Sequence, residues 1–559
     1  MATTSIRTRY LAAAISTALA AGGLHAATIA VDSADDDADS TVCNLRSALQ
    51  AVNDGSTLTV PTCALAVSGD PFGTDDTIVL SALSPITLTR GALTVTASTV
   101  TINGAVKIAP PPYSPYYQYQ TIDAAGGSRV IAIADGSTLK ANKLDLTGGQ
   151  TAENGGAIAL GVGATAILSN CSIFSNITTA NGGAIYASPS STLTLVDSTV
   201  SGNSSLAGGA LFANDSAVTA TNTSIAYNSA TSRGGAIYAA SGALTLDTAS
   251  IYANTAQNHS GGIAVANAKF TMSNSRVFAN SGGRGGGIFL SQATGTITTS
   301  TIDGNSATCG FACGGAMLLV GSSLAVSGST FSGNLAAGLT NYVTGGVNLL
   351  GSAATFANST ISGNVAAGYG SASGAFSQEH LSANTRLTLI NTTVTQNTAV
   401  AVHGIAAGGV LLGLLDFSPP PAGYDKFTAQ NTIISGNTPG DTNIVFDMFG
   451  TSLMVEYSLL GSAQNTSAFN DPANHNIFSD LPGLGPLQNN GGSTKTHALL
   501  PGSPALASGA NELAVLSGQP LDFDQRGPDY LRIFGGRVDI GAFEDQTDQL
   551  FADGFEVGP

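Results

Sequence analysis

The chain has little charge, few cysteines and no tryptophan. Asp, Glu, Lys and Arg together make up 9% of its 559 residues, against about 25% in an average globular protein. There are 18 basic and 35 acidic residues, so the formal net charge is −17. This balance argues against a nucleic-acid-binding protein, which needs basic surfaces to contact phosphates. So few charges also argue against long exposed helices, which ion pairs and strong helix formers would stabilise.

Apolar residues and glycine, by contrast, are plentiful. The hydrophobic fraction is 43%, which is too high for an intrinsically disordered acidic chain. Glycine accounts for 69 residues, roughly 12% of the chain against an average near 7%. We therefore expect an ordered fold, and the spacing of the glycines indicates its organisation.

The first 26 residues predict a secretory signal peptide. Arg7 and Arg9 form a positive N-terminal region, and Leu11 to Ala21 form a short apolar stretch. Leu24-His25-Ala26 offers a cleavage site after Ala26. The alternative, a membrane anchor, is disfavoured because the stretch is too short to span a bilayer. A second apolar stretch, Ala399 to Leu415, contains four glycines and keeps the period of the repeat described below. It is interpreted as a buried coil, so no transmembrane helix is expected in the mature chain.

Five cysteines in an exported chain permit two disulfides and one free thiol. Cys43 and Cys63 would close a loop of about 20 residues, worth roughly 3 kcal/mol in the chain-entropy model. Cys309 and Cys313 flank three residues and could close a short turn. Metal binding by the second pair is the alternative, but no histidine or further cysteine pair follows at zinc spacing. Cys171 remains, as a small buried hydrophobic residue.

Two markers repeat together along the chain, the first of them every 25 to 31 residues, which is the main signal in the sequence. The first is a Gly-Gly pair, which begins at Gly155, Gly182, Gly208, Gly234, Gly261, Gly286, Gly314 and Gly345. The second is a β-branched or aromatic residue followed three positions later by asparagine: Asn176, Asn203, Asn228, Asn254, Asn280, Asn305, Asn334, Asn364, Asn397 and Asn437. The agreement of two independent markers predicts a solenoid.

Each period contains three short runs with strand-like alternation. One example is Gly183–Ala187, then Leu193–Leu195, then Ser198–Val200. No helical pattern lies between the runs, which excludes β-α-β units. A compact coil of three short strands, stacked on the next coil at about 4.8 Å, satisfies this pattern. The sequence therefore predicts a parallel β-helix, with glycine where a corner needs a positive φ or a close backbone approach.

Asparagine in the same place on successive coils predicts a ladder of amide hydrogen bonds along the stack. A second position, just before the third strand of each coil, also carries asparagine or aspartate. Its members are Asn170, Asp197, Asn222, Asp247, Asn274, Asn358, Asn391 and Asn431.

Four sequence motifs resemble known repeats. GGAI occurs at 155–158, 182–185 and 234–237, and FSGN at 331–334. They resemble the GGAI and FxxN repeats of polymorphic outer-membrane proteins and, more broadly, bacterial right-handed β-helix repeat proteins. The resemblance covers roughly residues 150 to 440. It implies a right-handed solenoid that is secreted or held at the cell surface or outer membrane of a Gram-negative bacterium.

The N-terminal end of the solenoid has a predicted helical cap. Leu45, Ala48, Leu49 and Val52 lie at i, i+3, i+4 and i+7, on one face of a short helix. STVCNLRSALQAVN at 40–53 resembles the CSLREA segment of secreted β-helix proteins, with Ser47 where that family has glutamate. An acidic run precedes the helix. A solvated run is favoured over calcium binding: Asp32, Asp35, Asp36, Asp37 and Asp39.

Beyond residue 455 the repeat gives way to Pro- and Gly-rich sequence. QNNGGSTKTHALLPGSPALASGAN at 488–511, DFDQRG at 522–527 and VDIGAFE at 538–544 resemble the choice-of-anchor Q segment. FADGFE at 551–556 resembles a short tail of exported proteins. The predicted domains are a signal peptide over 1–26, a cap over 27–77, a β-helix over 78–454, a choice-of-anchor Q-like segment over 455–545 and a tail over 546–559.

Few residues suggest catalysis. Asp197 and Asp247, interpreted as equivalent positions two coils apart, are the best pair of carboxylates, but asparagines at the same place on other coils favour a structural ladder. Arg276, Arg284 and His259 could contact an anionic glycan, with ordinary surface charge as the favoured alternative. Residues 110–120 carry four tyrosines that could stack on sugar rings, although a plain loop is favoured.

The predicted fold is an all-β right-handed parallel β-helix solenoid with a short N-terminal helical cap and an irregular C-terminal segment. The predicted function is a secreted or surface-exposed scaffold for adhesion or for binding a glycan or another cell-surface ligand. No catalytic residue, cofactor or nucleic-acid partner is expected, and calcium has no firm support. The alternative is an extracellular polysaccharide lyase or glycoside hydrolase on the same fold. The sequence makes no prediction of oligomeric state.

Overall fold

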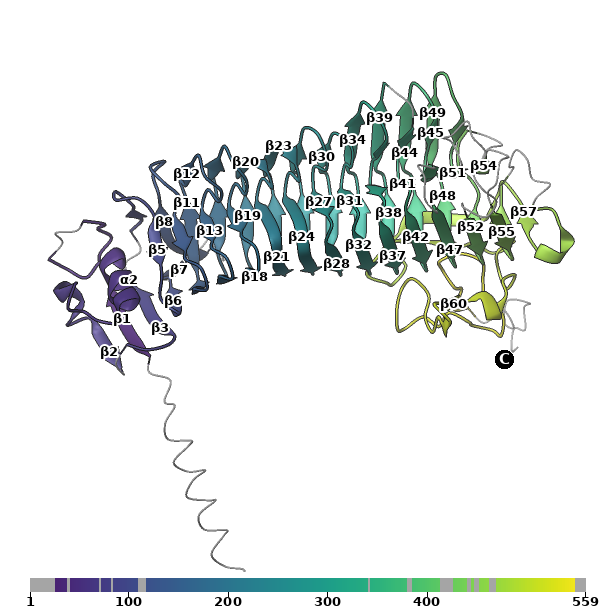
Figure 1. Cartoon of the computed structure of the whole chain (residues 1–559). Coiled ribbons are helices and arrows are strands. Elements are labelled where there is room, and N and C mark those ends of the chain that lie inside the picture. The colour runs from purple at the N-terminus through teal and green to yellow at the C-terminus, as the bar shows by residue number, and fades with distance from the viewer. Residues whose placement is uncertain are drawn as a thin grey trace, which may run out of the picture.

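The computed structural model describes residues 26–37, 41–69, 72–81, 84–108, 117–339, 342–379, 385–412, 426–439, 444–446, 452–461 and 469–547. The strands stack into an elongated parallel β-helix of about 13 turns (Figure 1). The predicted fold class is thereby confirmed. The predicted signal peptide up to residue 25, most of the tyrosine-rich insertion and the tail from residue 548 lie outside the described residues.

The typical central coil contributes to four ladders of strands. The coil that follows Gly182 consists of β17 (Ile185–Ala187), β18 (Thr192–Val196), β19 (Thr199–Ser201) and β20 (Ser204–Ala207). The sequence predicted the first three and missed β20. β20 was missed because its small or polar residues, Ser205 and Ala207, point inward, while its large apolar residue, Leu206, is 47% exposed. This alternation is the opposite of that expected for a strand on a hydrophobic core.

The strands form four long ladders and one short ladder along the solenoid axis. The first ladder follows the Gly-Gly pairs: β5 (Leu93–Val95), β9 (Ile131–Ile133), β13 (Ile158–Leu160), β17, β21 (Leu211–Thr221), β24 (Ile237–Asp247), β27 (Ile263–Ala266), β31 (Ile288–Ser291), β36 (Met317–Val320), β41 (Val347–Leu350), β46 (Phe376–Glu379), β51 (Val410–Leu412) and β54 (Ile444–Phe446). The second ladder contains β1 (Ala27–Val31), β3 (Asp76–Leu80), β6 (Thr99–Asn103), β10 (Thr138–Asn142), β14 (Thr165–Ser169), β18, β21, β24, β28 (Lys269–Ser273), β32 (Thr294–Thr298), β37 (Ser323–Ser327), β42 (Ala353–Ala357), β47 (Arg386–Ile390), β52 (Lys426–Gln430) and β55 (Ser452–Glu456). β21 and β24 run through both ladders and join them into one sheet.

The third ladder covers another side of the shaft: β4 (Ile86–Thr87), β8 (Tyr117–Asp123), β11 (Leu144–Thr147), β15 (Ser172–Phe174), β19, β22 (Ser224–Ala226), β25 (Ser250–Tyr252), β29 (Arg276–Phe278), β33 (Thr301–Asp303), β38 (Thr330–Ser332), β43 (Thr360–Ser362), β48 (Thr393–Thr395), β53 (Ile433–Ile434), β56 (Leu459–Leu460) and β57 (Ile477–Phe478). The fourth ladder completes the coil: β12 (Gln150–Thr151), β16 (Ile177–Thr178), β20, β23 (Ser229–Arg233), β26 (Thr255–Ala256), β30 (Ser281–Gly282), β34 (Ser306–Cys309), β39 (Leu335–Gly338), β44 (Val365–Gly368) and β49 (Thr398–Ala401). A short fifth ladder is added in the later coils: β35 (Cys313–Gly314), β40 (Val343–Thr344), β45 (Ala372–Ser373) and β50 (Ala406–Ala407). Two further strands pair antiparallel with strands of these ladders: β2 (Val67–Gly69) with β1, and β7 (Val106–Ile108) with β8.

The Gly-Gly pairs occupy the corner before the first ladder, as predicted. Gly182 has a φ of +71°, a region that L side chains rarely adopt. A Cβ on the adjacent Gly183 would lie 2.1 Å from the carbonyl oxygen of Gly209 in the next coil. Neither position therefore accepts a larger residue without a shift of the backbone.

The predicted asparagine ladder is present and buried. In its repeating unit, the backbone N–H of Asn228 donates to Oδ1 of Asn254 at 2.9 Å, and Nδ2 of Asn228 donates to the same atom at 3.0 Å. The same pattern joins all ten predicted asparagines, from Asn176 to Asn437. The ladder satisfies amides that would otherwise be unpaired inside the shaft.

The second asparagine position is a left-handed corner, with one correction. Asn170, Asp197 and Asn222 have φ values of +52°, +48° and +47°. In the next coil, however, Thr248 takes this conformation, with φ +53°, and Asp247 aligns with Thr221. Asp247 and Asp197 are therefore not equivalent, because the strand that contains Asp247 reaches the corner one residue later.

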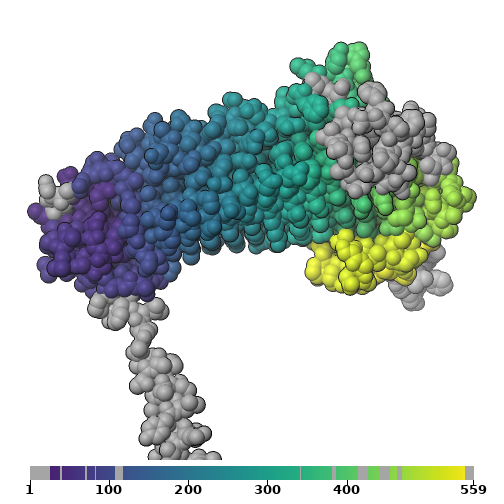
Figure 2. Space-filling model, viewed as in Figure 1, coloured from purple at the N-terminus to yellow at the C-terminus, as the bar shows by residue number. Residues whose placement is uncertain are grey.

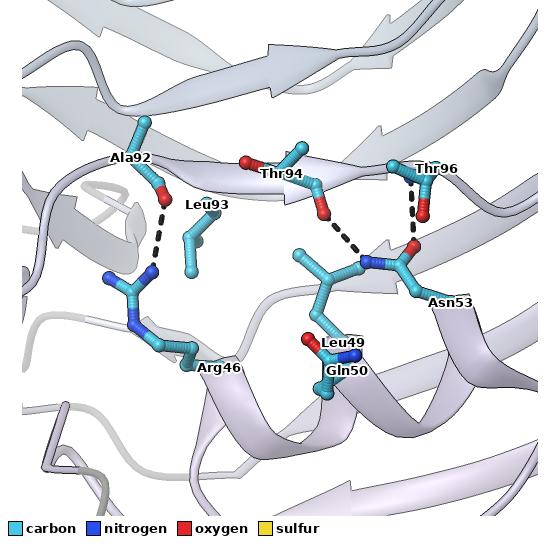
Figure 3. A pocket seen from close by; sticks show the side chains of 8 residues that line it. All are labelled: Arg46, Leu49, Gln50, Asn53, Ala92, Leu93, Thr94 and Thr96. Carbon is cyan, nitrogen blue, oxygen red and sulfur yellow. Dashed lines mark hydrogen bonds between the residues drawn. The ribbon is translucent and has the colours of Figure 1, made fainter.

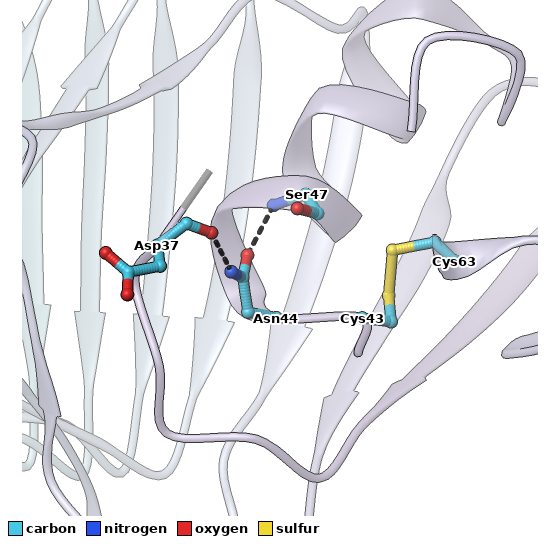
Figure 4. The surroundings of a disulfide bond; sticks show 5 residues. All are labelled: Asp37, Cys43, Asn44, Ser47 and Cys63. Carbon is cyan, nitrogen blue, oxygen red and sulfur yellow. Dashed lines mark hydrogen bonds between the residues drawn. A yellow bond between two sulfur atoms is a disulfide. The ribbon is translucent and has the colours of Figure 1, made fainter. Parts of the chain in front are cut away.

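The N-terminal cap is a helix, α2 (Leu45–Asp54), which closes the end of the shaft. Its four predicted apolar residues are buried, and the Asn44 side chain accepts a hydrogen bond from Ser47 N at 2.9 Å (Figure 4). The predicted Cys43–Cys63 disulfide lies beside it (Figure 4). The second predicted disulfide, Cys309–Cys313, is present as well, and Cys171 is free and buried.

One aspartate of the acidic run differs from its neighbours. Asp32, Asp35 and Asp37 are exposed, but Asp36 is buried and pairs with Arg46 at 2.7 Å. Burial alone would raise the pKa of Asp36, but the hydrogen bond from Arg46 and those from the backbone at residues 89 and 90 bring it below its usual range. Asp36 therefore fastens the cap to the first coil.

The C-terminal segment folds back along the flank of the later coils (yellow in Figures 1 and 2). It contains two short antiparallel hairpins, β58 (Leu484–Gln488) with β59 (Thr496–Leu499) and β60 (Val515–Leu516) with β61 (Gln519–Pro520). It bonds to outward side chains of the third ladder: Thr360 Oγ1 donates to Gln525 Oε1 at 2.6 Å, and Ser362 Oγ lies 2.8 Å from His497 Nε2. The segment thus covers β38, β43 and β48.

Candidate functional site

The two aspartates of the predicted catalytic alternative are both held by the next coil. Asn222 Nδ2 donates to Asp197 Oδ1 at 2.6 Å. Asp247 Oδ1 accepts from Ser273 Oγ at 2.6 Å and from Asn274 Nδ2 at 3.0 Å, and these two hydrogen bonds lower the pKa of Asp247. A lowered pKa suits a permanent carboxylate rather than a general acid.

A cavity of about 350 Å³ lies between α2 and β5 (Figure 3). Its polar side chains are already used by the backbone of the first coil. Arg46 donates to Ala92 O at 3.0 Å, and Asn53 both donates to Thr94 O at 2.7 Å and accepts from Thr96 N at 2.9 Å. These bonds seal the edge of β5, since an open strand edge would otherwise expose unpaired groups. The cavity is therefore part of the cap.

A row of aromatic side chains points outward from the first ladder. The register places Tyr186, Phe212 and Tyr238 side by side on β17, β21 and β24. The ring centroids are 5.5 Å apart for Tyr186 and Phe212, and 5.1 Å apart for Phe212 and Tyr238. All three rings are partly exposed. We call these three residues the aromatic row.

A hollow of about 410 Å³ lies at the N-terminal end of this row. It forms because the two coils before Tyr186 carry Ala132 and Ala159 at the same outward position, which leaves space beside the tyrosine ring. Arg129 and Glu153 line the hollow and pair with each other at 2.7 Å. The Glu153 side chain is 77% exposed, so its carboxylate is available to a bound group.

Three basic residues lie on the corner that borders the row at its other end: Arg233, His259 and Arg284. They occupy successive coils, four residues before the first core residue of β24, β27 and β31 respectively. Arg233 NH1 donates to Tyr238 Oη at 3.3 Å, and the His259 ring packs edge-on against Phe289 with centroids 5.1 Å apart. We call these three residues the corner group; its two arginines carry the positive charge at neutral pH.

The structure corrects the predicted grouping of Arg276 with Arg284 and His259. Arg276 lies on β29 of the third ladder, where its guanidinium pairs with Asp303 at 2.5 Å and covers the ring of Phe278. The grouping was suggested by the short separation of these residues in the sequence. The chain turns a corner between residues 276 and 284, however, so the two arginines lie on different sides of the coil. Arg233, which the sequence analysis passed over, takes the place of Arg276.

Sequence reasoning also missed the aromatic row, although a signal was present. In three successive repeats the residue that follows the buried aliphatic residue is Tyr186, Phe212 or Tyr238. An aromatic residue that recurs at an outward position cannot be explained by the core. Reading the repeats against one another would have placed these rings in a line.

A buried carboxyl group lies further along the first ladder. Glu379 is 0% exposed, and its Oε1 accepts from Asn348 Nδ2 at 2.7 Å and from Ser377 Oγ at 3.2 Å. Burial raises the pKa of Glu379 to about 8, although these two hydrogen bonds lower it. The side chain is therefore mostly protonated at neutral pH.

This carboxyl group makes stability depend on pH. Glutamate in the unfolded chain titrates near 4.5 and in the folded chain near 8, so folding becomes less favourable as the pH rises between these values. Glu379→Gln removes this penalty. We expect it to raise the free energy of unfolding by roughly 3 kcal/mol at pH 7 and to change it little at pH 4, as measured by urea denaturation. Glu512→Gln, at an exposed position, is the matched control; an equal effect of Glu379→Gln at both pH values would contradict the assignment.

The comparisons with known proteins do not assign this chain to a family. No protein-family model matches the chain, and no curated protein matches it. Among solved structures, the chain is similar to the crystal structure of pectate lyase Pel9A, with 12% identity over 92% of this chain and 96% of that chain, and a TM-score of 0.25. A likeness at this level carries no functional argument.

The described residues also bear on metals and membranes. In this part of the chain no three His, Cys, Asp or Glu side chains lie together as a metal would require. Nor is any helix there, including the ten-residue α2, both long and apolar enough to cross a bilayer.

Proposed function

We propose that the chain is a secreted or surface-exposed β-helix scaffold that binds a glycan along the aromatic row. The observation that carries the proposal is the line formed by Tyr186, Phe212 and Tyr238, one strand apart and partly exposed, next to a hollow of about 410 Å³. The C–H faces of sugar rings pack on aromatic rings, while the hydroxyl groups need hydrogen-bond partners. The Glu153 carboxylate and the Asn154 side chain supply such partners in the hollow.

An extracellular location fits the chemistry of the chain. Two disulfides, Cys43–Cys63 and Cys309–Cys313, suit an oxidising compartment. A signal peptide over residues 1–26 would direct the chain there. We further propose, from the resemblances in its sequence, that residues 27–77 are a CSLREA-like cap, 78–454 the β-helix, and 455–545 a choice-of-anchor Q-like segment of a protein from the surface of a Gram-negative bacterium.

The proposal is tested by binding to a panel of immobilised polysaccharides. Burying a tyrosine ring is worth about 1.5–3 kcal/mol, so Tyr186→Ala should weaken binding by about tenfold or more. Tyr252→Ala is the matched control, because Tyr252 belongs to a separate aromatic stack on the third ladder, with Phe278 at 4.8 Å. Equal losses in the two variants would place the ligand elsewhere.

The same assay distinguishes a scaffold from an enzyme. A scaffold should leave every bound polymer at its original length, as measured by release of reducing or unsaturated ends. Release of ends that Asp197→Ala or Asp247→Ala abolishes would overturn the scaffold proposal in favour of a lyase or hydrolase.

A further inference from the structure

We propose that the corner group, Arg233, His259 and Arg284, recognises the anionic groups of an acidic polysaccharide lying along the aromatic row, through the charges of its two arginines. This inference rests on the proposed function and names the class of its ligand: a polymer that carries carboxylate or sulfate groups at intervals. It follows from the position of the three side chains, from their lack of counter-charges and from the character of the surface beside them.

The three residues of the corner group form one line parallel to the row. The backbone N–H of His259 donates to Ser232 O at 3.2 Å, and the N–H of Arg284 donates to His259 O at 3.2 Å, so they lie on adjacent coils of the same corner. Adjacent coils are about 4.8 Å apart. A polymer along the solenoid axis would therefore pass each of these residues in turn while its sugar rings contact Tyr238 and its neighbours.

No carboxylate in the described part of the chain pairs with these three residues, although carboxylates pair with other arginines throughout the molecule. Arg233 bonds only to the Tyr238 hydroxyl, and the buried Nδ1 of His259 has no partner. Five other arginines each have a carboxylate oxygen within 2.7 Å: Arg46, Arg129, Arg276, Arg526 and Arg532. Arg233 and Arg284 are thus two neighbouring arginines without a carboxylate partner in the described residues, in a chain of net charge −17.

The two arginines of the corner group repel each other and keep its histidine neutral. Burial, and then the charges of Arg233 and Arg284, lower the pKa of His259 to about 4. Burial and the charge of Arg233 also lower the pKa of Arg284. Two arginine charges held together in this way destabilise the free protein, and an anion beside them would offset the repulsion.

The surroundings favour a polysaccharide over other anions. Nucleic-acid binding relies on many phosphate contacts, whereas only the two arginines of the corner group border this row with positive charge, and the chain as a whole is acidic. The adjoining aromatic row and the hollow beside Ala159 offer partly exposed apolar surface in a line, which an isolated phosphate ion would not use. An extended ligand of alternating apolar faces and acidic groups matches both features.

The test uses the full mature chain and three forms of one polymer backbone: a hexameric uronic acid, its carboxyl-reduced neutral form, and the neutral form after sulfation. We expect the uronic acid or the sulfated form to bind at least tenfold more tightly than the neutral form at low salt, and the difference to shrink as ionic strength rises. The double variant Arg233→Gln/Arg284→Gln should lose this preference and keep its affinity for the neutral form. Tighter binding of the uronic acid would identify carboxylate as the recognised anion, and tighter binding of the sulfated form would identify sulfate.

Matched variants separate charge from folding. Arg276→Gln removes an arginine that pairs with Asp303 on the third ladder and should leave the preference intact, and Arg284→Lys keeps the charge and should retain most of it. Equal binding of neutral and acidic forms by the unaltered protein would overturn this inference while leaving the proposed function standing. Absence of binding to all three forms, or tighter binding to a DNA duplex, would overturn the inference, and failure of the whole polysaccharide panel would overturn the proposed function.

Discussion

Asn254→Ala should lower the free energy of unfolding by about 5 kcal/mol. Oδ1 of Asn254 accepts from both N and Nδ2 of Asn228, and its Nδ2 donates to Ile225 O and Tyr252 O at 2.9 Å each. Alanine leaves these groups without partners inside the shaft. Each unsatisfied buried group costs about 1–3 kcal/mol, so the losses add up to a large fraction of the stability of an ordinary domain.

The ladder is directional, and this gives a sharper measurement than stability alone. The backbone N–H of Asn228 donates to Asn254, whereas the N–H of Asn254 donates to Asn280. Hydrogen exchange in Asn254→Ala should therefore accelerate most at the amide of residue 228, on the N-terminal side of the substitution. Asn258→Ala, at an exposed position with no side-chain hydrogen bond of its own in the structure, is the matched control. Equal acceleration at residues 228 and 280 would mean that the coil has simply unfolded.

Arg532→Ala should release the C-terminal segment from the flank of the solenoid. Arg532 is 0% exposed; its guanidinium pairs with Glu544 at 2.6 Å, donates to Gly541 O at 3.0 Å and reaches Asn358 Oδ1 at 3.3 Å. Removing one partner of a buried pair leaves an uncompensated charge and costs about 3–5 kcal/mol. Burial raises the pKa of Glu544 to about 7 even though Arg532 lowers it, so the full effect is expected at pH 8, where Glu544 is ionised.

Limited proteolysis reports this release directly. The segment over residues 484–547 should be cleaved early in Arg532→Ala while the coils stay protected. Arg537→Ala is the control within the same segment, because Arg537 is exposed and bonds only to backbone carbonyls at residues 508 and 509. The double variant Arg532→Met/Glu544→Leu removes both charges and should recover much of the loss. If it recovers nothing, packing rather than charge pairing holds the segment.

The sequence motifs at the two ends of the solenoid thus have a structural role in the described residues. In the CSLREA-like segment, Arg46 and Asn53 bond to the backbone of the first coil. In the choice-of-anchor Q-like segment, Gln525 bonds to Thr360, and Arg526 lies between the rings of Tyr530 and Phe543, 3.7 and 3.8 Å from their centroids. These polar residues of the two segments thus fasten the ends of the solenoid.

Much of the fold could be predicted, because the signals that define a coil are local and repeated. The Gly-Gly pairs, the ten ladder asparagines, the cap helix and both disulfides were predicted and are present. The prediction was wrong where one coil departs from its neighbours. Thr248 rather than Asp247 takes the left-handed corner, and β20 faces Leu206 outward, since neither shift changes the spacing of the glycine and asparagine markers.

The candidate site was harder to predict, because it is composed of outward residues. Core positions of successive coils are constrained alike by the shaft, but an outward position can carry any residue, so the repeat does not mark Tyr186 or Arg233 as special. Whether two such residues meet depends on register and on which side of a corner each lies. Arg276 and Arg284 are eight positions apart in the sequence and yet belong to different sides of the coil.

The sequence by itself determined the architecture of this protein: a stack of similar coils, with small and β-branched residues inside, glycine and asparagine at the corners, and capped ends. These features follow from one coil and its neighbour, so periodicity is enough to reveal them. Only the tertiary structure decided which exposed side chains lie together. Ser362 and His497 meet across 135 residues of chain, and Tyr186 and Tyr238 share one surface because two turns of the solenoid bring them into line. Such contacts depend on the exact register of stacking and on the path of a non-repetitive segment, and no local pattern in the chain records either.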